Sequence, residues 1–252
     1  MSDSDKKTVK LKIKRQDNAD APPRWEEFEV PWENHLNVHA ALMSIQRKPV
    51  TCEGKKVAPV QWDANCMEEV CGSCTMIVNG RVKQACSALV DNEEQPIELR
   101  PMSKFPLIRD LVVDRERIFT DFKRVHAWVD VDGTHDLGPG PRMSPEVADM
   151  RYELSRCMAC GCCMEACPNY GPQSLWIGAA AVNQARLFNA HPSGAHHADD
   201  RLDALLDDGG VQDCGNSQNC VEVCPKEIPL TTSLADMMGK TAKHALASIF
   251  RK

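Results

Sequence analysis

Short runs of alternating apolar and polar residues mark the first part of the chain, and this period-two pattern predicts half-buried β-strands. After its first residue, the stretch TVKLKIK (8–14) has an apolar side chain at every second position. EEFEV (26–30) repeats the pattern. We therefore predict strands in both segments, each with one face turned toward a core.

A helix and a hairpin are predicted from the residues that follow. NVHAALMSI (37–45) has apolar residues at helical spacing, and Asn37 is a suitable N-cap. In CTMIVNGRV the alternation runs into the dipeptide Asn79-Gly80, a strong signal for a two-residue hairpin turn. PIEL (96–99) reads as a closing strand. This order predicts a small mixed sheet packed on a helix.

Helical spacing of apolar residues replaces the alternation in the second half. The segments are LVVDRERIFTDFKRVHAWV (111–129), PEVADMRYELSRC (145–157) and DDRLDALLDD (199–208), with a Gly/Pro-rich loop at 132–144. A long stretch without cysteine, 87–156, coincides with the change. We predict an α+β protein with two domains, 1–106 and 107–252, the second mostly α-helical.

Length and cysteine content narrow the class of protein. The chain has 252 residues and 13 cysteines, and its N-terminus, MSDSDKKTVK, is charged and has no apolar segment. We expect no export signal, so a disulfide framework is disfavoured and metal-bound thiolates in a reducing compartment are favoured. The longest apolar run, LWIGAAAV (175–182), is too short to cross a bilayer, which takes about 20 residues.

Charge argues against nucleic acid as a partner. The formal net charge is −6, from 30 basic and 36 acidic residues that are dispersed along the chain. KLKIKR (10–15) is the one basic cluster. Its lysines alternate with apolar residues, so we interpret it as the solvated face of a strand.

The first cysteine group has the spacing of a plant-type [2Fe–2S] site, C-x4-C-x2-C with a fourth cysteine further on. Its members are Cys66, Cys71, Cys74 and Cys86. The small residues of CGSC would let backbone N–H groups turn toward the sulfurs, and the fourth cysteine arrives beyond the hairpin. Structural zinc also takes four thiolates, but its ligands usually come as closely spaced pairs.

The second and third groups are two bacterial ferredoxin runs, C-x2-C-x2-C-x3-C-P. CMACGCCMEACP supplies Cys157, Cys160, Cys163 and Cys167. CGNSQNCVEVCP supplies Cys214, Cys220 and Cys224, and has Ser217 at its second cysteine position. In two-cluster ferredoxins the fourth cysteine of each run binds the other cluster.

Crossing the runs predicts the ligand sets. Cys157, Cys160, Cys163 and Cys224 would hold a [4Fe–4S] cluster. Cys167, Cys214 and Cys220 supply three thiolates, which predicts a [3Fe–4S] cluster that accepts electrons more readily than its neighbour. A full cube with Ser217 as a ligand, or a decayed site, is the alternative.

Two cysteines and a histidine pair lie outside these sets. Cys162 is interpreted as a small packing residue beside a cluster, and Cys52 lies in a predicted loop. His196 and His197 are expected in an exposed loop. We find no phosphate-binding loop, dinucleotide fingerprint or Ser/His/Asp arrangement. Three clusters of different ligation therefore indicate an electron path rather than a catalytic site.

The combined pattern resembles the iron–sulfur subunits of succinate dehydrogenase and fumarate reductase. Beyond the cysteines, five stretches resemble the menaquinone-linked enzymes of Bacillus type. They are KIKRQDN (12–18), WEEFEVP (25–31), GPGPRM (138–143), FNAHP (188–192) and CGNSQNCVEVCPKEIPLTTS (214–233). The resemblance implies a plant-type ferredoxin β-grasp module followed by a bacterial-ferredoxin-like module.

The resemblance also implies partners. A flavoprotein subunit with covalent FAD would oxidise succinate and pass electrons to this chain. A membrane-anchor cytochrome b subunit with haem would receive them and reduce menaquinone. The chain would be a non-catalytic electron-transfer subunit of succinate:quinone oxidoreductase, peripheral on the cytoplasmic face of the cell membrane, with no membrane-spanning segment of its own.

Two departures from ubiquinone-reducing relatives concern the quinone. Those relatives have a tryptophan pair and a histidine where this chain has NYGP (169–172) and Gly215. We therefore assign no quinone ligands. A cluster subunit of another flavin-linked dehydrogenase complex is the main alternative, and a zinc-stabilised binding module is a third; the [2Fe–2S] spacing and Ser217 favour the first interpretation.

Overall fold

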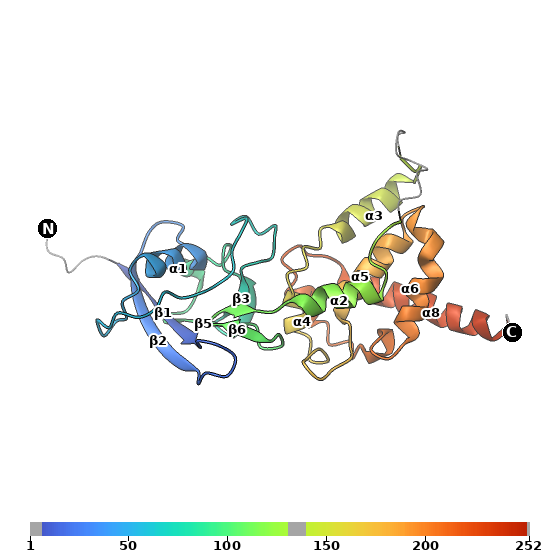
Figure 1. The fold of residues 1–252 in the computed structure, drawn as a ribbon. Coiled ribbons are helices and arrows are strands. Elements are labelled where there is room, and N and C mark those ends of the chain that lie inside the picture. Colours follow the sequence, from blue (N-terminus) through green and yellow to red (C-terminus); the bar gives the residue numbers. More distant parts are fainter. Residues whose placement is uncertain (1–6, 131–139, 251–252) are drawn as a thin grey trace. The chain divides into compact units, whose positions relative to one another are not determined.

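A computed structural model describes residues 7–130 and 140–250 of the chain. The chain divides into two compact units, and the boundary in the sequence falls between Arg115 and Glu116 (Figure 1). The predicted Gly/Pro-rich loop at 132–144 lies for the most part outside the described residues, and 140–144 form neither helix nor strand. The α+β class is confirmed: the first unit is built on a mixed sheet and the second on helices.

The first unit is a five-stranded sheet in the order β2-β1-β5-β3-β4. The strands are β1 (Thr8–Arg15), β2 (Arg24–Pro31), β3 (Thr75–Val78), β4 (Arg81–Gln84) and β5 (Ile97–Arg100). The first strand runs parallel to β5, while the other pairings are antiparallel. The core lies between the sheet and helix α1 (Val38–Arg47), as the alternation in the sequence predicts.

Local signals account for these elements. Asn37 caps α1, because its side chain accepts a hydrogen bond from the Ala40 N–H at 2.8 Å. Asn79 and Gly80 join β3 to β4 with φ angles of 47° and 77°, the left-handed pair that a type I′ turn requires. The predicted helix, hairpin and closing strand are therefore confirmed, with bounds that differ by one or two residues.

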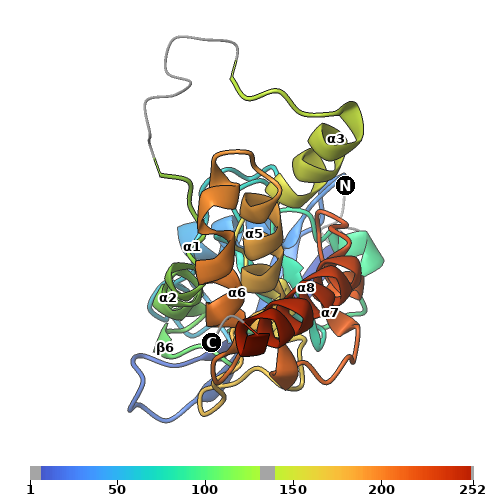
Figure 2. The same cartoon turned by 90° about the vertical axis from the view of Figure 1, so that its right-hand side faces the viewer.

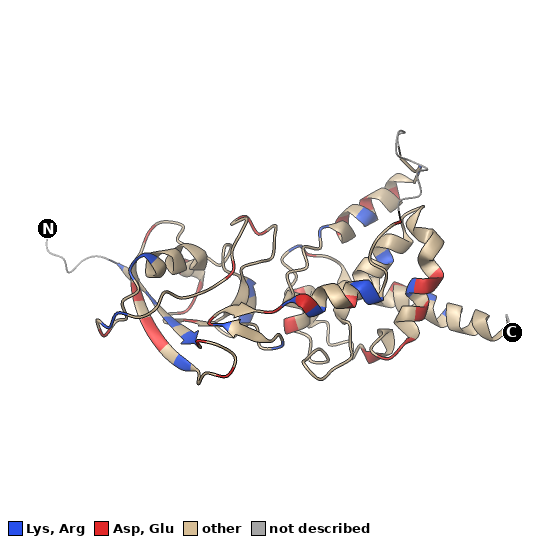
Figure 3. Cartoon of the chain, in the orientation of Figure 1, with Lys and Arg blue, Asp and Glu red and all other residues tan. Residues whose placement is uncertain are grey.

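Lysines on the outer face of β1 lie opposite glutamates of β2. Lys10 pairs with Glu29 and Lys12 with Glu27, an arrangement of opposite charges across two strands that stabilises a sheet (Figure 3). The solvated-face interpretation of KLKIKR is therefore confirmed for the lysines. It is wrong for Arg15, which is fully buried.

The prediction that helical structure starts at 111 is also wrong. Strands β6 (Leu107–Arg109) and β7 (Val112–Val113) form a small hairpin that belongs to the first unit. Asp110 forms its turn with a φ of 47°, and the β-branched valines that follow favour a strand. A short 3₁₀ turn, η2 (Val90–Asn92), completes the unit.

Helix α5 (Gly178–Asn189) forms the centre of the second unit, and most of its residues are buried. It packs against helices that precede it and helices that follow it in the sequence, as two views of the ribbon show (Figures 1 and 2). These are α2 (Glu116–Arg124), α3 (Pro145–Ser155), α6 (Ala198–Leu206) and α8 (Leu230–Phe250). The predicted helices at 145–157 and 199–208 are confirmed as α3 and α6.

Two further short helices lie within the cysteine runs: α4 (Cys162–Glu165) and α7 (Asn219–Glu222). The 3₁₀ turn η3 (Gly194–His197) precedes α6, and the 3₁₀ turn η4 (Val211–Asp213) precedes the third cysteine group. His196 and His197 lie in η3, where His197 pairs with Asp130 and Asp200. Among the described residues, no helix combines the length and the apolar character needed to cross a bilayer.

Candidate metal centres

The loop that contains Cys66 and Cys71 directs backbone N–H groups at sulfur. Cys66 Sγ accepts from the N–H groups of Val70 at 3.3 Å and Cys71 at 3.2 Å. Cys71 Sγ accepts from the Cys66 N–H at 3.4 Å and the Ser73 N–H at 3.5 Å. Such donors stabilise negative charge on sulfur, so the loop fits thiolate ligands.

Left-handed residues make this wrapping possible. Met67, Glu69 and Gly72 all have positive φ values, between 55° and 73°. Arg115 closes the loop from outside, because its guanidinium donates to the carbonyl oxygens of Gly72 and Ser73 at 2.5 Å each. Nothing in the local sequence pattern marks Arg115, since it lies far along the chain from the loop that it holds.

The remaining cysteines of this group, Cys74 and Cys86, are buried beside each other. Burial raises the pKa of Cys74 to about 12; the Cys86 N–H opposes this rise, whereas the Cys86 thiol adds to it. Burial also acts on Cys71, but hydrogen bonds from Ser73 and Cys66 outweigh it and bring its pKa to about 6. A bound metal would displace the proton of the buried thiol, as it does for coordinating thiols in general.

The second and third cysteine loops have the same backbone. In the second loop, Ala159 and Gly161 have φ values of 51° and 85° and precede helix α4. In the third loop, the equivalent residues Asn216 and Gln218 have φ values of 52° and 64° and precede α7. Ser217 therefore lies on a backbone shaped like that of a complete run.

Two side-chain hydrogen bonds join the runs. The Asn219 amide donates to the Ala166 carbonyl oxygen at 3.0 Å, and the Asn169 amide donates to the Asp213 carbonyl oxygen at 2.9 Å. A Cβ atom on Gly215 would lie 2.7 Å from Asn169 Oδ1. The Asn169 side chain therefore occupies the space that any side chain larger than hydrogen at position 215 would need.

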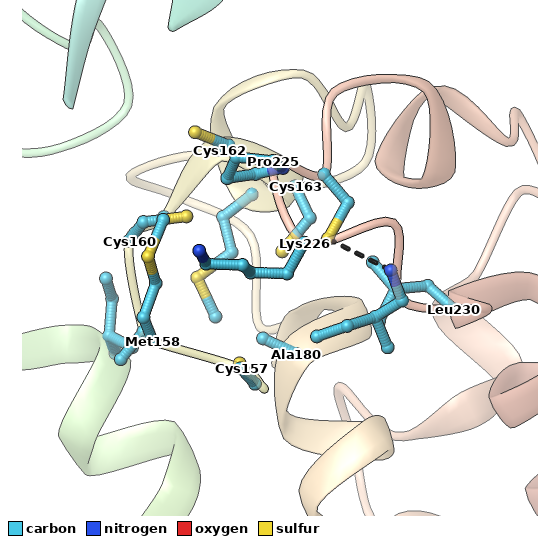
Figure 4. A pocket seen from close by; sticks show the side chains of 15 residues that line it. Cys157, Met158, Cys160, Cys162, Cys163, Ala180, Pro225, Lys226 and Leu230 are labelled. Atoms are coloured by element: carbon cyan, nitrogen blue, oxygen red, sulfur yellow. Dashed lines mark hydrogen bonds between the residues drawn. The ribbon is translucent and has the colours of Figure 1, made fainter. Parts of the chain in front are cut away.

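One cavity of the second unit brings Cys224 beside the first three cysteines of the other run. Cys157, Cys160, Cys163 and Cys224 all line it (Figure 4). Burial raises the pKa of Cys163 well above its ordinary value, and the Cys160, Cys157 and Cys224 sulfurs add to the rise. The four sulfurs are thus close enough to influence one another, and the Ile228 N–H donates to Cys224 Sγ at 3.5 Å.

A second cavity collects the other crossed set. Cys167, Cys214 and Cys220 line it together with Ser217, and the rest of its wall combines apolar residues such as Trp176 with uncharged polar ones such as Thr231. Burial raises the pKa of Cys220, and the sulfurs of Cys167 and Cys214 contribute in the same direction. The structure thus places the cysteines in the two groups that the crossed ferredoxin pattern predicts.

The two cysteines outside the ligand sets lie as their patterns suggest. Cys162 is buried and lines the first cavity, but its sulfur points away from Cys157 and Cys163 in Figure 4. Cys52 is exposed in a turn. Within residues 7–130 and 140–250, no three His, Cys, Asp or Glu side chains are arranged to hold a single metal ion.

The donor chemistry of the three loops fits iron–sulfur clusters. Thiolates are the ligands of such clusters, and cavities lined by several sulfurs, with N–H groups directed at them, suit a multi-atom centre. Comparison with known families agrees. The family described as "2Fe-2S iron-sulfur cluster binding domain" matches residues 10–120, and that described as "4Fe-4S dicluster domain" matches residues 153–228. The fold and sites therefore define an iron–sulfur electron-transfer protein.

Similarity over the full length identifies the family. The chain is 55% identical to the succinate dehydrogenase iron–sulfur subunit of Bacillus subtilis, over 98% of both chains. It is 36% identical to the fumarate reductase iron–sulfur subunit of Wolinella succinogenes, over 72% of this chain and 77% of the relative. The chain belongs to the family of succinate dehydrogenase and fumarate reductase iron–sulfur subunits.

A solved structure supports the fold. A chain of the Mycobacterium smegmatis Sdh1 complex in the apo form superposes with a TM-score of 0.77 at 23% sequence identity. The match covers 94% of this chain and 97% of that chain. The predicted succession of a plant-type ferredoxin module and a helical ferredoxin-like module is therefore confirmed.

Proposed function

We propose that this chain relays electrons from a flavoprotein subunit with covalent FAD, which oxidises succinate to fumarate, to menaquinone in a membrane-anchor cytochrome b subunit with haem. Its carriers would be a [2Fe–2S], a [4Fe–4S] and a [3Fe–4S] cluster. The observation that carries the proposal is the crossed grouping of cysteines from two runs around two cavities.

Eleven cysteines are the proposed ligands. The [2Fe–2S] set is Cys66, Cys71, Cys74 and Cys86; the [4Fe–4S] set is Cys157, Cys160, Cys163 and Cys224; and the [3Fe–4S] set is Cys167, Cys214 and Cys220. When bound, the clusters supply one-electron carriers whose potentials depend on cluster type, charge and surroundings. We assign no catalytic residue to this chain.

The protein's part is to hold the sulfurs and set their surroundings. Backbone N–H groups stabilise charge on Cys66 and Cys71, and Arg115 keeps their loop closed. In the second unit, apolar walls that include Trp176 and Leu230 restrict water around the sulfurs. Hydrogen bonds to the sulfurs and exclusion of water are the means by which a protein sets the reduction potential of a bound cluster.

Ser217 is the basis for a three-iron centre. It lines the second cavity at the position where a complete run has a cysteine, so three thiolates remain. A neutral hydroxyl binds iron poorly, and a site with three thiolates would hold a cluster lacking one iron. The retained left-handed backbone at Asn216 and Gln218 argues against a decayed site.

The first unit is the proposed docking surface for the flavoprotein. Met67 and Val70, on the first cysteine loop, are 55% and 57% exposed, so apolar side chains surround the ligands nearest the surface. The second unit would contact the membrane anchor, which would place the chain peripherally on the cytoplasmic face of the membrane. The names of the two relatives, both subunits of larger enzymes, support assembly with such partners.

Stepwise reduction of the purified complex, followed by EPR, tests the proposal. We expect three signals of distinct cluster types, about nine irons per chain, and a copurifying subunit that carries covalent FAD. A colourless protein with zinc and no cluster signal would overturn it. If the chain carries the clusters but copurifies with no subunit that contains covalent FAD, it would instead be a subunit of another dehydrogenase complex.

A further inference from the structure

One charged side chain lines the cavity of the proposed [4Fe–4S] cluster. Lys226 follows Cys224 by two residues, and its side chain runs across the cavity in the view of Figure 4, with its nitrogen toward Cys160. Among the described residues that line this cavity, the others are cysteines or uncharged side chains. Lys226 is half-buried and makes no hydrogen bond or ion pair with another described residue.

The other cavity has no such charge. Its described lining residues include polar groups, such as Asn216, Gln218 and Thr231, but none that is charged. Because the runs have the same backbone, Lys226 has a direct counterpart: Asn169 follows Cys167 by two residues, as Lys226 follows Cys224. Asn169 is neutral, and its amide is engaged with the Asp213 carbonyl. The repeat therefore places a cation beside one set of sulfurs only.

We infer that Lys226 sets the potential of the cluster held by Cys157, Cys160, Cys163 and Cys224. The inference rests on the ligand assignment proposed above. Four thiolates give that centre a net negative charge, and reduction adds one more electron. A permanent positive charge at the cavity wall stabilises the reduced form more than the oxidised form, because attraction grows with the negative charge. Lys226 thus raises the midpoint potential and eases electron entry.

The ammonium also suits this place sterically. A lysine carries its charge on a flexible four-carbon stem, so the stem can cover apolar surface while the nitrogen stays near solvent. Residues such as Ile228 and Leu230 supply that apolar surface in the same cavity. Lys226 therefore covers part of the cavity and brings charge to it, while the ligands remain the cysteines.

Potentiometric titration of the purified complex, monitored by EPR, tests the inference. Lys226→Gln removes the charge and keeps a polar side chain of similar reach. We expect its [4Fe–4S] midpoint to fall by the equivalent of a tenfold change in the equilibrium constant, 59 mV for one electron. The other two clusters should keep their potentials, and iron content should not change.

Two further variants isolate the charge. Lys226→Arg keeps it and should leave the midpoint near that of the wild type. Lys243→Gln removes an equal charge from the exposed face of α8, away from both cavities, and should have no effect. A Lys226→Gln midpoint equal to that of Lys243→Gln would overturn the inference. So would loss of cluster iron from Lys226→Gln, which would assign the lysine a structural role.

The same titration tests the role of Lys226 separately from the ligand assignment on which it depends. If wild-type protein shows no [4Fe–4S] signal, the ligand assignment itself fails. If the signal is present and only the response to Lys226→Gln is missing, the assignment stands and the role of the lysine is refuted.

Discussion

The guanidinium of Arg15 and the carboxylate of Asp110 form an ion pair with no solvent exposure, with Nε and Oδ1 2.9 Å apart. The same carboxylate accepts from the N–H groups of Gln16 at 3.1 Å and Gln61 at 3.0 Å. Asp110 therefore fastens the end of β1, the segment before the first cysteine loop and the β6–β7 turn to one another.

Replacing Asp110 with alanine should strongly destabilise the first unit. The change removes one of the two carboxylate partners of the buried Arg15 guanidinium, the other being Glu26, and it leaves two backbone donors without an acceptor. Removing one partner of a buried ion pair costs about 3–5 kcal/mol, and the remaining pair with Glu26 places the expected loss at the lower end of that range. Urea unfolding followed by circular dichroism measures the effect. Asp17→Ala breaks an exposed pair with Arg24 in the same unit and should leave the midpoint nearly unchanged.

Replacing Ser217 with cysteine should convert the proposed three-iron centre toward a four-iron one. The residue lines the cavity with Cys167, Cys214 and Cys220, so a fourth thiolate there completes the ligand set. We expect about one more iron per chain, loss of the EPR signal of the oxidised complex, a lower potential and slower quinone reduction. Ser217→Ala is the control and should keep the three-iron signal. An unchanged signal in the cysteine variant would contradict the assignment.

Removing Cys224 should damage the [4Fe–4S] centre and not its neighbour, even though Cys224 belongs to the third cysteine group. The reason is that it lines the cavity of Cys157, Cys160 and Cys163. Cys224→Ala and Cys167→Ala should therefore abolish different EPR signals, each that of the opposite run. Cys162→Ala, in the same run as Cys167, should abolish neither EPR signal. The reverse pattern of losses would show that the runs are not crossed.

Asp121 should make stability fall as pH rises toward neutrality. Burial raises its pKa from 3.8 to about 6, against the opposing effects of Arg117 and of the Tyr170 hydroxyl. The folded protein thus holds a proton that the unfolded chain releases near pH 4, and this stabilisation is present at low pH and is lost as pH passes through about 6.

Asp121→Asn should remove this dependence while keeping an acceptor for the Tyr170 hydroxyl, which lies 3.3 Å from the carboxylate. The free energy of unfolding, measured from pH 5 to 8, should fall for the wild type relative to the variant by about 1–3 kcal/mol. Parallel curves for the two proteins would count against a raised pKa.

Local patterns in the sequence were sufficient for the elements that carry their own signals. Alternation marks β1 and β2, and the turn at Asn79 and Gly80 fixes a hairpin. The cysteine spacing predicted which sulfurs share a cavity, because the ferredoxin repeat encodes the crossing in its intervals. Local patterns failed at β7, where the valines form a strand inside a stretch predicted to be helical.

The burial of polar side chains by partners far along the chain could not be predicted in the same way. Arg15 is buried against two carboxylates, those of Glu26 on the neighbouring strand and of Asp110 far along the chain, and no local pattern joins the arginine to Asp110. Helix α5 is buried on nearly all sides, so its short apolar run has no amphipathic period to separate helix from strand. Helix α8 buries Ser233 and Thr241 among its apolar contacts, which hides its inner face from a hydrophobic pattern.

The exchange of cysteines between the two runs also bears on how the protein is made. The wall formed by Cys157, Cys160 and Cys163 is completed by Cys224, which a ribosome adds long after those three residues. A nascent chain that has passed the first run therefore offers three sulfurs and an open side. On the proposed ligand sets, insertion of both inorganic centres into the second unit must await synthesis of the third cysteine group, and a product truncated before it would be left without either.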